Sequence, residues 1–325
     1  MQIDAPKIQK IISEASSVVI MAHKNLDLDA LGSSLGMYYL SKSLGKTTHL
    51  LIEEEHHEMG VARSLKELKI RNLNISIKSL SELKMFIDNR TLLIVLDVHI
   101  PEITQNKEVF NFVKNIIIID HHVQDKEFVE DIKYKYVESS LSSTSEVVIE
   151  VLKDSNNYIP SYVATVMLAG IVIDTNRFAQ KTTSRTHDSA SYLYAAGADS
   201  KELQYLLKED LDRYNKRQEI IAGVSLVNSS FAVGMGPDVY VYYTEDLAKV
   251  SDTLLWCEAV EASYTIAKIE ENVVGISARS LGNIDVQKIM ERLGGGGHIT
   301  DAATQLRGIS IEEAREKLIE TLKKV

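Results

Sequence analysis

Two segments of this chain are so uniformly apolar that, as strands, they must be buried on both faces. Residues 91–96 read Thr-Leu-Leu-Ile-Val-Leu, and residues 115–119 are an asparagine followed by four isoleucines. Near-continuous apolar runs of this length are typical of the central strands of a parallel sheet, because helices cover both faces of such a sheet. The chain is therefore predicted to contain a parallel sheet inside an α/β domain.

Alternating strand and helix patterns surround these two runs. Strands are expected over Ser17–Ala22 and Thr48–Ile52, and helices over Ala30–Ser43, Ser143–Leu152 and Pro160–Ile173. This alternation predicts a doubly wound α/β domain with a mainly parallel sheet. In such domains ligands bind at the carboxyl ends of the strands, near the point where the strand order reverses.

The composition and the hydrophobic pattern of the sequence change near residue 199. Residues 201–223 are rich in Glu, Lys, Leu and Gln and lack a strand pattern, which indicates a long helix or a helical linker. Beyond them we expect strands and then helices of a smaller mixed sheet: Ser229–Ala232, Val239–Tyr243, Tyr264–Ile269 and Val273–Ala278 as strands, Ile284–Leu293 and Ile311–Lys324 as helices. The predicted division is a first domain over 1–197, a helical linker over 198–223, and a second, smaller α/β domain over 224–325.

Composition excludes several classes of protein. With 45% hydrophobic and 25% charged residues, the chain is typical of a globular protein. No apolar run approaches the roughly 20 residues of a membrane span, and the N-terminus lacks a secretory signal pattern, so we expect no membrane contact from this chain and a cytoplasmic location. A net charge of −10 argues against a protein that coats long nucleic acid. It does not exclude small anionic ligands, because carboxylates that bind divalent metals lose their negative character.

Acids and histidines follow four of the apolar runs. The residues concerned are His23, Asp27 and Asp29 after the first strand, Asp97 after the second run, Asp120-His121-His122 after the isoleucines, and Asp174 after Gly170–Ile173. The last of these runs can also be the end of a helix. A helix cap explains Asp27 or Asp29 taken alone, and a strand end explains Asp97 alone. Capping does not explain the whole set, which indicates a ligand cluster.

Carboxylates and imidazoles without thiolates favour a divalent ion such as manganese, magnesium or ferrous iron over a structural zinc site. The candidates outnumber the ligands that one ion takes while also holding water. Two ions about 3.5–4 Å apart that share one carboxylate fit better, and such a pair activates water for attack on phosphorus. Adjacent histidines point different ways, so at most one of His121 and His122 is expected to bind metal directly.

A second group of polar residues lies in the predicted second domain. Arg279-Ser280 follows a predicted strand, and Gly294-Gly295-Gly296-Gly297-His298 follows a predicted helix. A glycine run can be a hinge, but it also lets the backbone approach an anion and expose N–H groups to it. The neighbouring His298 and Arg279 favour phosphate or nucleotide binding. In the first domain, Arg185 can either contact a phosphate or brace its loop.

Taken in this order, the motifs resemble the DHH/DHHA1 phosphoesterase superfamily. The first domain matches through the ligand candidates and the Asp120-His121-His122 triplet, and the second through Arg279-Ser280 and the glycine loop. Within the superfamily the likeness is strongest with the catalytic part of GdpP-type cyclic di-AMP phosphodiesterases. It is carried by residues 138–146, 169–175, 184–188 and 276–282.

The resemblance implies roles for individual residues. His23, Asp27 and Asp97 would hold one manganese ion, and Asp29, Asp97, His121 and Asp174 the other, with Asp97 as the bridge. His122 would lie near the attacked phosphate. The nucleotide would contact Arg279, Ser280, Gly294, Gly295, Gly296, Gly297 and His298, and Arg185 is a further substrate candidate. Relative to the family pattern, Leu26 replaces a proline, Ile100 an arginine, and Val123 and Gln124 two frequent arginines.

The implied function is a manganese-dependent phosphodiesterase that hydrolyses cyclic di-AMP to linear pApA, with onward cleavage to AMP left open, by a hydroxide activated between two metal ions. Two alternatives stay open: a nanoRNase that acts on pApA and very short RNA, and a non-catalytic nucleotide sensor. The resemblance also implies a homodimer. Full-length GdpP-type proteins carry membrane and sensory regions, so the chain is expected to be either a stand-alone enzyme or the cytoplasmic part of an anchored protein.

Overall fold

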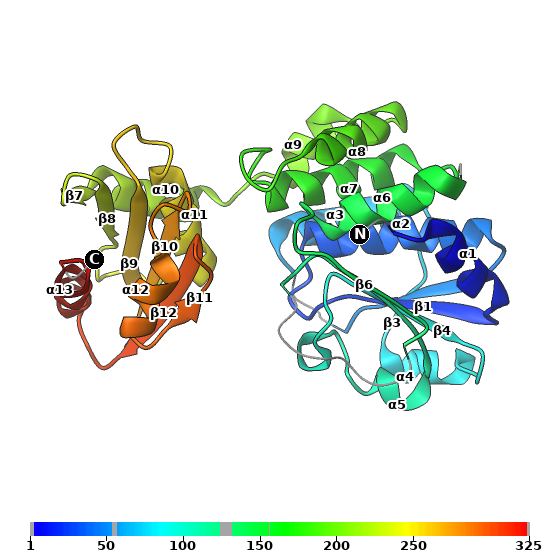
Figure 1. Cartoon of the computed structure of the whole chain (residues 1–325). Helices are drawn as coiled ribbons and strands as arrows, with labels where there is room; N and C mark the ends of the chain where they lie inside the picture. The colour runs from blue at the N-terminus through cyan, green and yellow to red at the C-terminus, as the bar shows by residue number, and fades with distance from the viewer. Residues whose placement is uncertain (1–2, 54–56, 124–131, 156, 324–325) are drawn as a thin grey trace. The chain divides into compact units, whose positions relative to one another are not determined.

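The computed structural model describes residues 3–53, 57–123, 132–155 and 157–323 (Figure 1). The chain forms two compact units, Met1–Lys208 and Glu209–Val325. The division falls inside the segment predicted as a linker. That segment is two helices, α9 (Ser200–Leu206) in the first unit and α10 (Leu211–Ala222) in the second. Asp210 is the N-cap of α10, because its carboxylate accepts the backbone N–H of Arg213, so α10 begins as a separate helix.

The first unit contains a parallel sheet of six strands in the order β3-β2-β1-β4-β5-β6. The strands are β1 (Ser17–Met21), β2 (Thr47–Leu51), β3 (Ile77–Lys78), β4 (Leu92–Leu96), β5 (Asn115–Asp120) and β6 (Tyr134–Val137). The strand order reverses between β1 and β4, which is the arrangement of doubly wound α/β folds. The predicted fold class is therefore confirmed.

Burial explains the uniform apolar character of the central strands. In β5, Ile117 and Ile119 face one core and Ile116 and Ile118 face the other. The first core lies under α1 (Ala5–Glu14), α2 (Leu28–Ser43), α6 (Thr144–Ser155) and α7 (Ser161–Asp174), and the second over the short helices α4 (Leu80–Leu83) and α5 (Val109–Phe112). Figure 1 shows these two helical layers on opposite faces of the sheet.

Further helices complete the first unit. They are α3 (Met59–Ile70) and α8 (Ser184–Ala195), with single 3₁₀ turns at Lys84–Phe86 and Pro101–Ile103. The helix α7 is buried over almost its whole length between α2 and the outer helices α8 and α9. Because α2 and α7 are both apolar on most sides, the acids at their ends lie at the border of the core. In the part of the chain that the structure describes, no helix is both long and apolar enough to cross a membrane.

The second unit is a mixed sheet in the order β11-β12-β10-β9-β8-β7, with β8 and β9 parallel and the other pairs antiparallel. Its elements are β7 (Ser225–Val227), β8 (Phe231–Met235), α11 (Thr244–Leu254), β9 (Ala262–Glu270), β10 (Val273–Ser280), α12 (Val286–Arg292), β11 (Gly296–Gly297), β12 (Asp301–Arg307) and α13 (Ile311–Leu322). The helices α12 and α13 cover one face, and α10 and α11 the other.

One predicted strand of the second unit is wrong. Residues 239–243 alternate valine and tyrosine side chains, yet they form a turn and an extended segment before α11. A turn begins at Pro237, whose carbonyl accepts the N–H of Tyr240, and only Tyr242 bonds across to Lys268. Val239 is 81% exposed, so the segment has no second face to bury. The alternating pattern alone therefore predicted a strand that does not form.

Candidate metal centre

The ligand candidates meet at the carboxyl ends of three adjacent strands. His23 lies two residues after β1, Asp97 follows β4, and His121 follows β5. Since β4 lies between β1 and β5 and all three run parallel, their ends share one edge of the sheet, at the reversal of strand order. Asp97 has φ +59°, a left-handed conformation that non-glycine residues rarely adopt, and its N–H still bonds Ile119 of β5. Such backbone strain concentrates at functional sites.

The helices α2 and α7 supply the remaining acids. Asp27 is the N-cap of α2 and accepts the N–H of Ala30 at 2.8 Å, Asp29 lies in the first turn, and Asp174 ends α7. The two helices approach closely because residue 170 is glycine. A Cβ at Gly170 would lie 2.6 Å from Asp29 Cα and 2.9 Å from Asp29 Oδ1. Gly170 thus brings the ends of both helices together.

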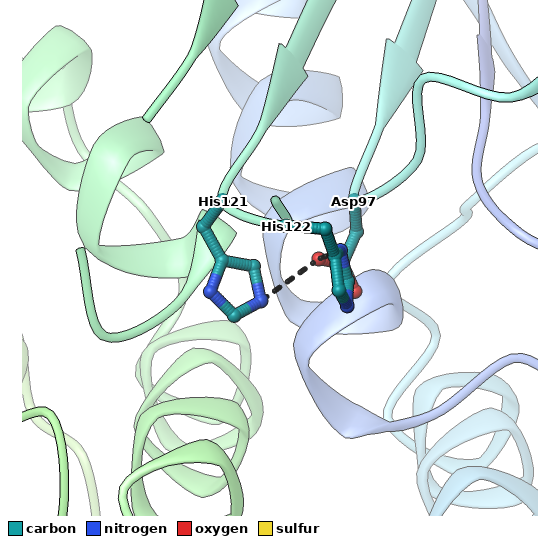
Figure 2. A group of neighbouring side chains, drawn as sticks. All are labelled: Asp97, His121 and His122. Atoms are coloured by element: carbon teal, nitrogen blue, oxygen red, sulfur yellow. Dashed lines mark ion pairs between the residues drawn. The ribbon is translucent and has the colours of Figure 1, made fainter. Parts of the chain in front are cut away.

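Asp97 joins two groups of side chains. Its Oδ2 lies 3.3 Å from His23 Nε2, which is 3.5 Å from Asp27 Oδ2. Its Oδ1 lies 3.4 Å from His121 Nε2, which is 3.2 Å from Asp174 Oδ2. Figure 2 shows His121 and Asp97 leaving neighbouring strand ends and pointing toward each other. The potential metal ligands fall into three groups, each within 4.8 Å: His23, Asp27 and Asp97; Asp29, His121 and Asp174; Asp97, His121 and His122.

Burial and neighbouring charges shift the pKa values of the carboxylates and histidines in this cluster. Burial, together with the charges of Asp174 and Asp97, raises the pKa of Asp29 well above its usual range. Burial also raises the pKa of Asp174 to about 6. Burial also raises the pKa of Asp97. The hydrogen bonds from His121 and His23 lower it by more, so the pKa of Asp97 lies well below the usual range. Burial lowers the pKa of His23. The hydrogen bonds and negative charges of Asp27 and Asp97 have the larger effect and raise this pKa to about 11.

This cluster fits a divalent cation. Four carboxylates converge, and among the described residues none of them pairs with a lysine or arginine. The donors are carboxylate oxygen and imidazole nitrogen, which suit a hard or borderline ion. Nδ1 of His121 is buried without a hydrogen-bond partner among the described residues, so the carboxylates contact this ring through its Nε2. All six residues predicted as metal ligands are thus brought together.

Several residues of the centre were not predicted. Thr144 Oγ1 donates to Asp97 Oδ1 at 2.9 Å, and the backbone N–H groups of Thr144 and Ser145 donate to Asp29 at 2.7 and 3.0 Å. Asp29 therefore caps α6 from another helix, which places its carboxylate at the positive end of the α6 dipole. The run of serines and threonines before α6 was the sequence signal for this contact.

The expectation that His121 and His122 point different ways is wrong. Their ring centroids are 4.5 Å apart, and His122 Nδ1 lies 3.7 Å from Asp97 Oδ1 (Figure 2). Alternation of side chains holds only within a strand, and β5 ends at Asp120. Asp120 is fully buried, and its Oδ1 accepts His122 Nδ1 at 2.8 Å. Gln124, at the position of a frequent family arginine, lies outside the described residues.

The predicted substrate residues have internal partners. Arg185 bonds Glu150 through Nε at 2.8 Å and so braces α8 against α6. In the second unit, Arg279 Nε lies 3.2 Å from Asp252 and 3.4 Å from Asp301, and Ser280 Oγ donates to the Ile284 carbonyl at 2.6 Å. Contact of these residues with a substrate stays a prediction.

The glycine run of the second unit is part of its sheet. Gly296 and Gly297 form β11, which pairs with Ala302 and Ala303 of β12. A Cβ at Gly295 would lie 2.1 Å from the Ala303 carbonyl oxygen, so no side chain fits there. His298 follows as an exposed residue. The glycines therefore allow a close backbone approach within the sheet.

Comparison with family models identifies both units. The model described as the DHH family, N-terminal domain, matches residues 17–171, and the DHHA1 domain model matches residues 239–324. The chain is a DHH/DHHA1 protein. The DHH match contains five of the six predicted metal ligands, with Asp174 three residues beyond its end, and the DHHA1 match contains Arg279 and the glycine loop.

Relatives of this DHH/DHHA1 chain carry the names of phosphodiesterases and of an oligoribonuclease. It is 39% identical to the cyclic-di-AMP phosphodiesterase GdpP of Bacillus subtilis over 316 residues, which cover 96% of the chain and 48% of the relative. It is 28% identical to the bifunctional oligoribonuclease and PAP phosphatase NrnA of Thermus thermophilus over 314 residues, covering 94% and 89%. The chain spans about half the length of the first curated relatives it matches.

A solved structure has the same fold. An exopolyphosphatase-related protein from Bacteroides fragilis superposes with a TM-score of 0.79 at 20% identity, covering 98% of this chain and 95% of that one. At this identity the likeness concerns the fold alone. It agrees with the two α/β units described above.

Proposed function

We propose that the chain is a metal-dependent phosphodiesterase that hydrolyses cyclic di-AMP to linear pApA. The observation that carries this proposal is the convergence on Asp97 of two ligand groups at the strand ends of a DHH domain. The similarity to a named cyclic-di-AMP phosphodiesterase over 96% of the chain supports the choice of substrate.

The two groups divide the ligands between two ions. His23, Asp27 and Asp97 would hold one, and Asp29, Asp97, His121 and Asp174 the other. When bound, such ions neutralise charge on a phosphoryl group and make water more acidic. The mixed oxygen and imidazole donors favour manganese.

Residues around the candidate ligands hold their side chains in place. Thr144 holds Asp97 Oδ1, and the α6 N-terminus holds both oxygens of Asp29, so neither carboxylate rotates freely. His122 is 56% exposed, and its Nδ1 is engaged with Asp120. Its Nε2 is therefore the ring nitrogen left for a phosphate oxygen of the substrate. Arg279, Ser280 and the loop at Gly294–His298 are proposed to bind the nucleotide.

Product analysis tests the proposal. The chain is incubated with cyclic di-AMP and manganese, and the products are separated by ion-pair chromatography. We expect linear pApA to accumulate, with AMP appearing later if the enzyme also opens the linear product. A metal-loaded chain that leaves cyclic di-AMP intact at high enzyme concentration would rule the activity out.

A second candidate function is an oligonucleotide phosphodiesterase that acts on pApA and very short RNA. The similarity to NrnA favours it, since that alignment covers 94% of this chain and 89% of the relative. Initial rates on cyclic di-AMP, pApA and a dinucleotide RNA under the same conditions distinguish the two. A non-catalytic sensor would bind the nucleotide tightly without turnover. Homodimerisation and a cytoplasmic location stay predictions.

Metal binding is expected to stabilise the first unit. An ion present at about 100 times its dissociation constant contributes about 2.7 kcal/mol, because it binds only the folded state. For a unit of this size, that raises Tm by about 5–10 °C. Differential scanning fluorimetry with manganese and with a chelator measures the difference. Equal melting temperatures in both conditions would mean that the carboxylate cluster holds no ion.

Replacing Thr144 by valine is expected to weaken manganese binding by about tenfold, because hydrogen bonds that orient metal ligands contribute factors of about 10–100. Valine keeps the shape but removes the donor to Asp97 Oδ1. Isothermal titration with manganese measures the affinity, and Thr144→Ser, which keeps the hydroxyl, is the matched control. Equal affinities for the two variants would show that the hydroxyl does not orient Asp97.

A further inference from the structure

A buried histidine outside the ligand set contacts the Asp120-His121-His122 turn. His99 is 3% exposed and lies two residues after Asp97. Its Nδ1 hydrogen-bonds Asp120 Oδ2. The other oxygen, Asp120 Oδ1, accepts Nδ1 of His122 at 2.8 Å and the backbone N–H of His122 at 3.1 Å. One fully buried carboxylate thus links His99 to His122.

The directions of these bonds follow from chemistry. An ionised carboxylate only accepts hydrogen bonds, so both imidazoles must present Nδ1–H to Asp120. Within this arrangement Nε2 of His122 faces away from its carboxylate partner.

We propose that His99 is a positioning residue for the phosphodiesterase reaction. It holds Asp120 Oδ2, which keeps Asp120 Oδ1 on His122 and fixes the half-exposed ring of His122 beside Asp97. This inference rests on the proposed function. His99 itself does not touch substrate; it acts through Asp120 and His122.

A role in packing alone does not account for His99. Its Nε2 is buried and has no hydrogen-bond partner among the described residues. A buried polar atom without a partner is unfavourable, so an apolar side chain of similar size would suit the core better. What the imidazole provides and an apolar side chain lacks is the Nδ1–H donor to Asp120.

Two substitutions separate the donor from the packing. In His99→Asn the side-chain amide nitrogen takes the place of Nδ1, and in His99→Leu a side chain of similar bulk has no donor. With cyclic di-AMP and manganese, we expect His99→Leu to lower kcat by about 10–100-fold, the range for residues that orient a functional group. KM is expected to change less than about twofold, and His99→Asn should recover most of kcat. Equal kcat values in the two folded variants would overturn the proposal.

Nuclear magnetic resonance gives a readout without turnover. Long-range ¹H–¹⁵N spectra of the magnesium-loaded wild-type chain should show that Nδ1 of His99 and Nδ1 of His122 each carry a proton. In His99→Leu, Nδ1 of His122 should be only partly protonated. An unprotonated Nδ1 on either ring in the wild type contradicts the proposal even if His99→Leu does not fold. If the wild type leaves cyclic di-AMP intact while these spectra are as expected, the proposed substrate fails and the positioning contact stands.

Discussion

Replacing Asp97 by alanine should lower the turnover of cyclic di-AMP by about a thousandfold or more. Asp97 is the only one of the six ligand candidates whose two oxygens face different groups, Oδ2 toward His23 and Oδ1 toward His121. Its removal therefore affects both candidate ion positions at once. A loss of about 4 kcal/mol of transition-state stabilisation, within the several kcal/mol that metal ions contribute, corresponds to a thousandfold.

The matched variants are Asp97→Asn and Asp27→Asn. Asparagine tolerates the left-handed backbone of residue 97, where φ is +59°, so Asp97→Asn removes the charge with little added strain. Of the ligand groups, Asp27 belongs to that of His23 alone, so Asp27→Asn should lose less activity than Asp97→Asn. Steady-state rates, with circular dichroism to verify folding, measure the series. An Asp97→Asn variant as active as Asp27→Asn would contradict a bridging role.

Replacing Gly170 by alanine should have the largest effect on stability. The new Cβ would meet the backbone of Asp29, with Cα at 2.6 Å and N at 3.0 Å, and backbone cannot turn aside as a side chain can. We expect α2 and α7 to separate at a cost of about 3 kcal/mol, or about 6–12 °C in Tm. Because Asp29 and Asp174 move apart, manganese affinity should fall by at least about tenfold.

Gly36→Ala is the control for this effect. Gly36 lies on α2, the helix that also carries Asp29, and its Cβ would meet Met167 Cε at 2.8 Å and Val148 Cγ1 at 2.9 Å, which are ends of side chains. It should lower Tm less and leave manganese affinity unchanged. Thermal melts and titrations on both variants decide the matter. If Gly170→Ala lost stability without losing metal affinity, the close approach of α2 and α7 would not be what places the ligands.

The sequence was sufficient to predict which residues meet at the candidate metal centre and the sheet that positions them. The runs before Asp97 and Asp120 are apolar on both faces because each strand packs against two cores, so the polar residues after them mark the strand ends. Asp174 was also found, because the acid ends a buried helix where the core stops. These signals are local in the sequence.

Contacts made across the fold left no such signal. Gly170 matters only because Asp29 of another helix lies against it, and His99 only because Asp120 lies beside it. The convergence of His121 and His122 depends on the bend after β5, which residue types alone do not define. The wrong strand at residues 239–243 failed for a related reason, since its pattern had no partner strand to bury it.

Anomalous diffraction at the manganese edge, from crystals of the chain grown with manganese, tests the two-ion centre most directly. We expect two peaks, one in contact with His23, Asp27 and Asp97, and the other with Asp29, Asp97, His121 and Asp174, with Asp97 shared. A single peak, or two peaks without Asp97 between them, would contradict the centre proposed for this chain.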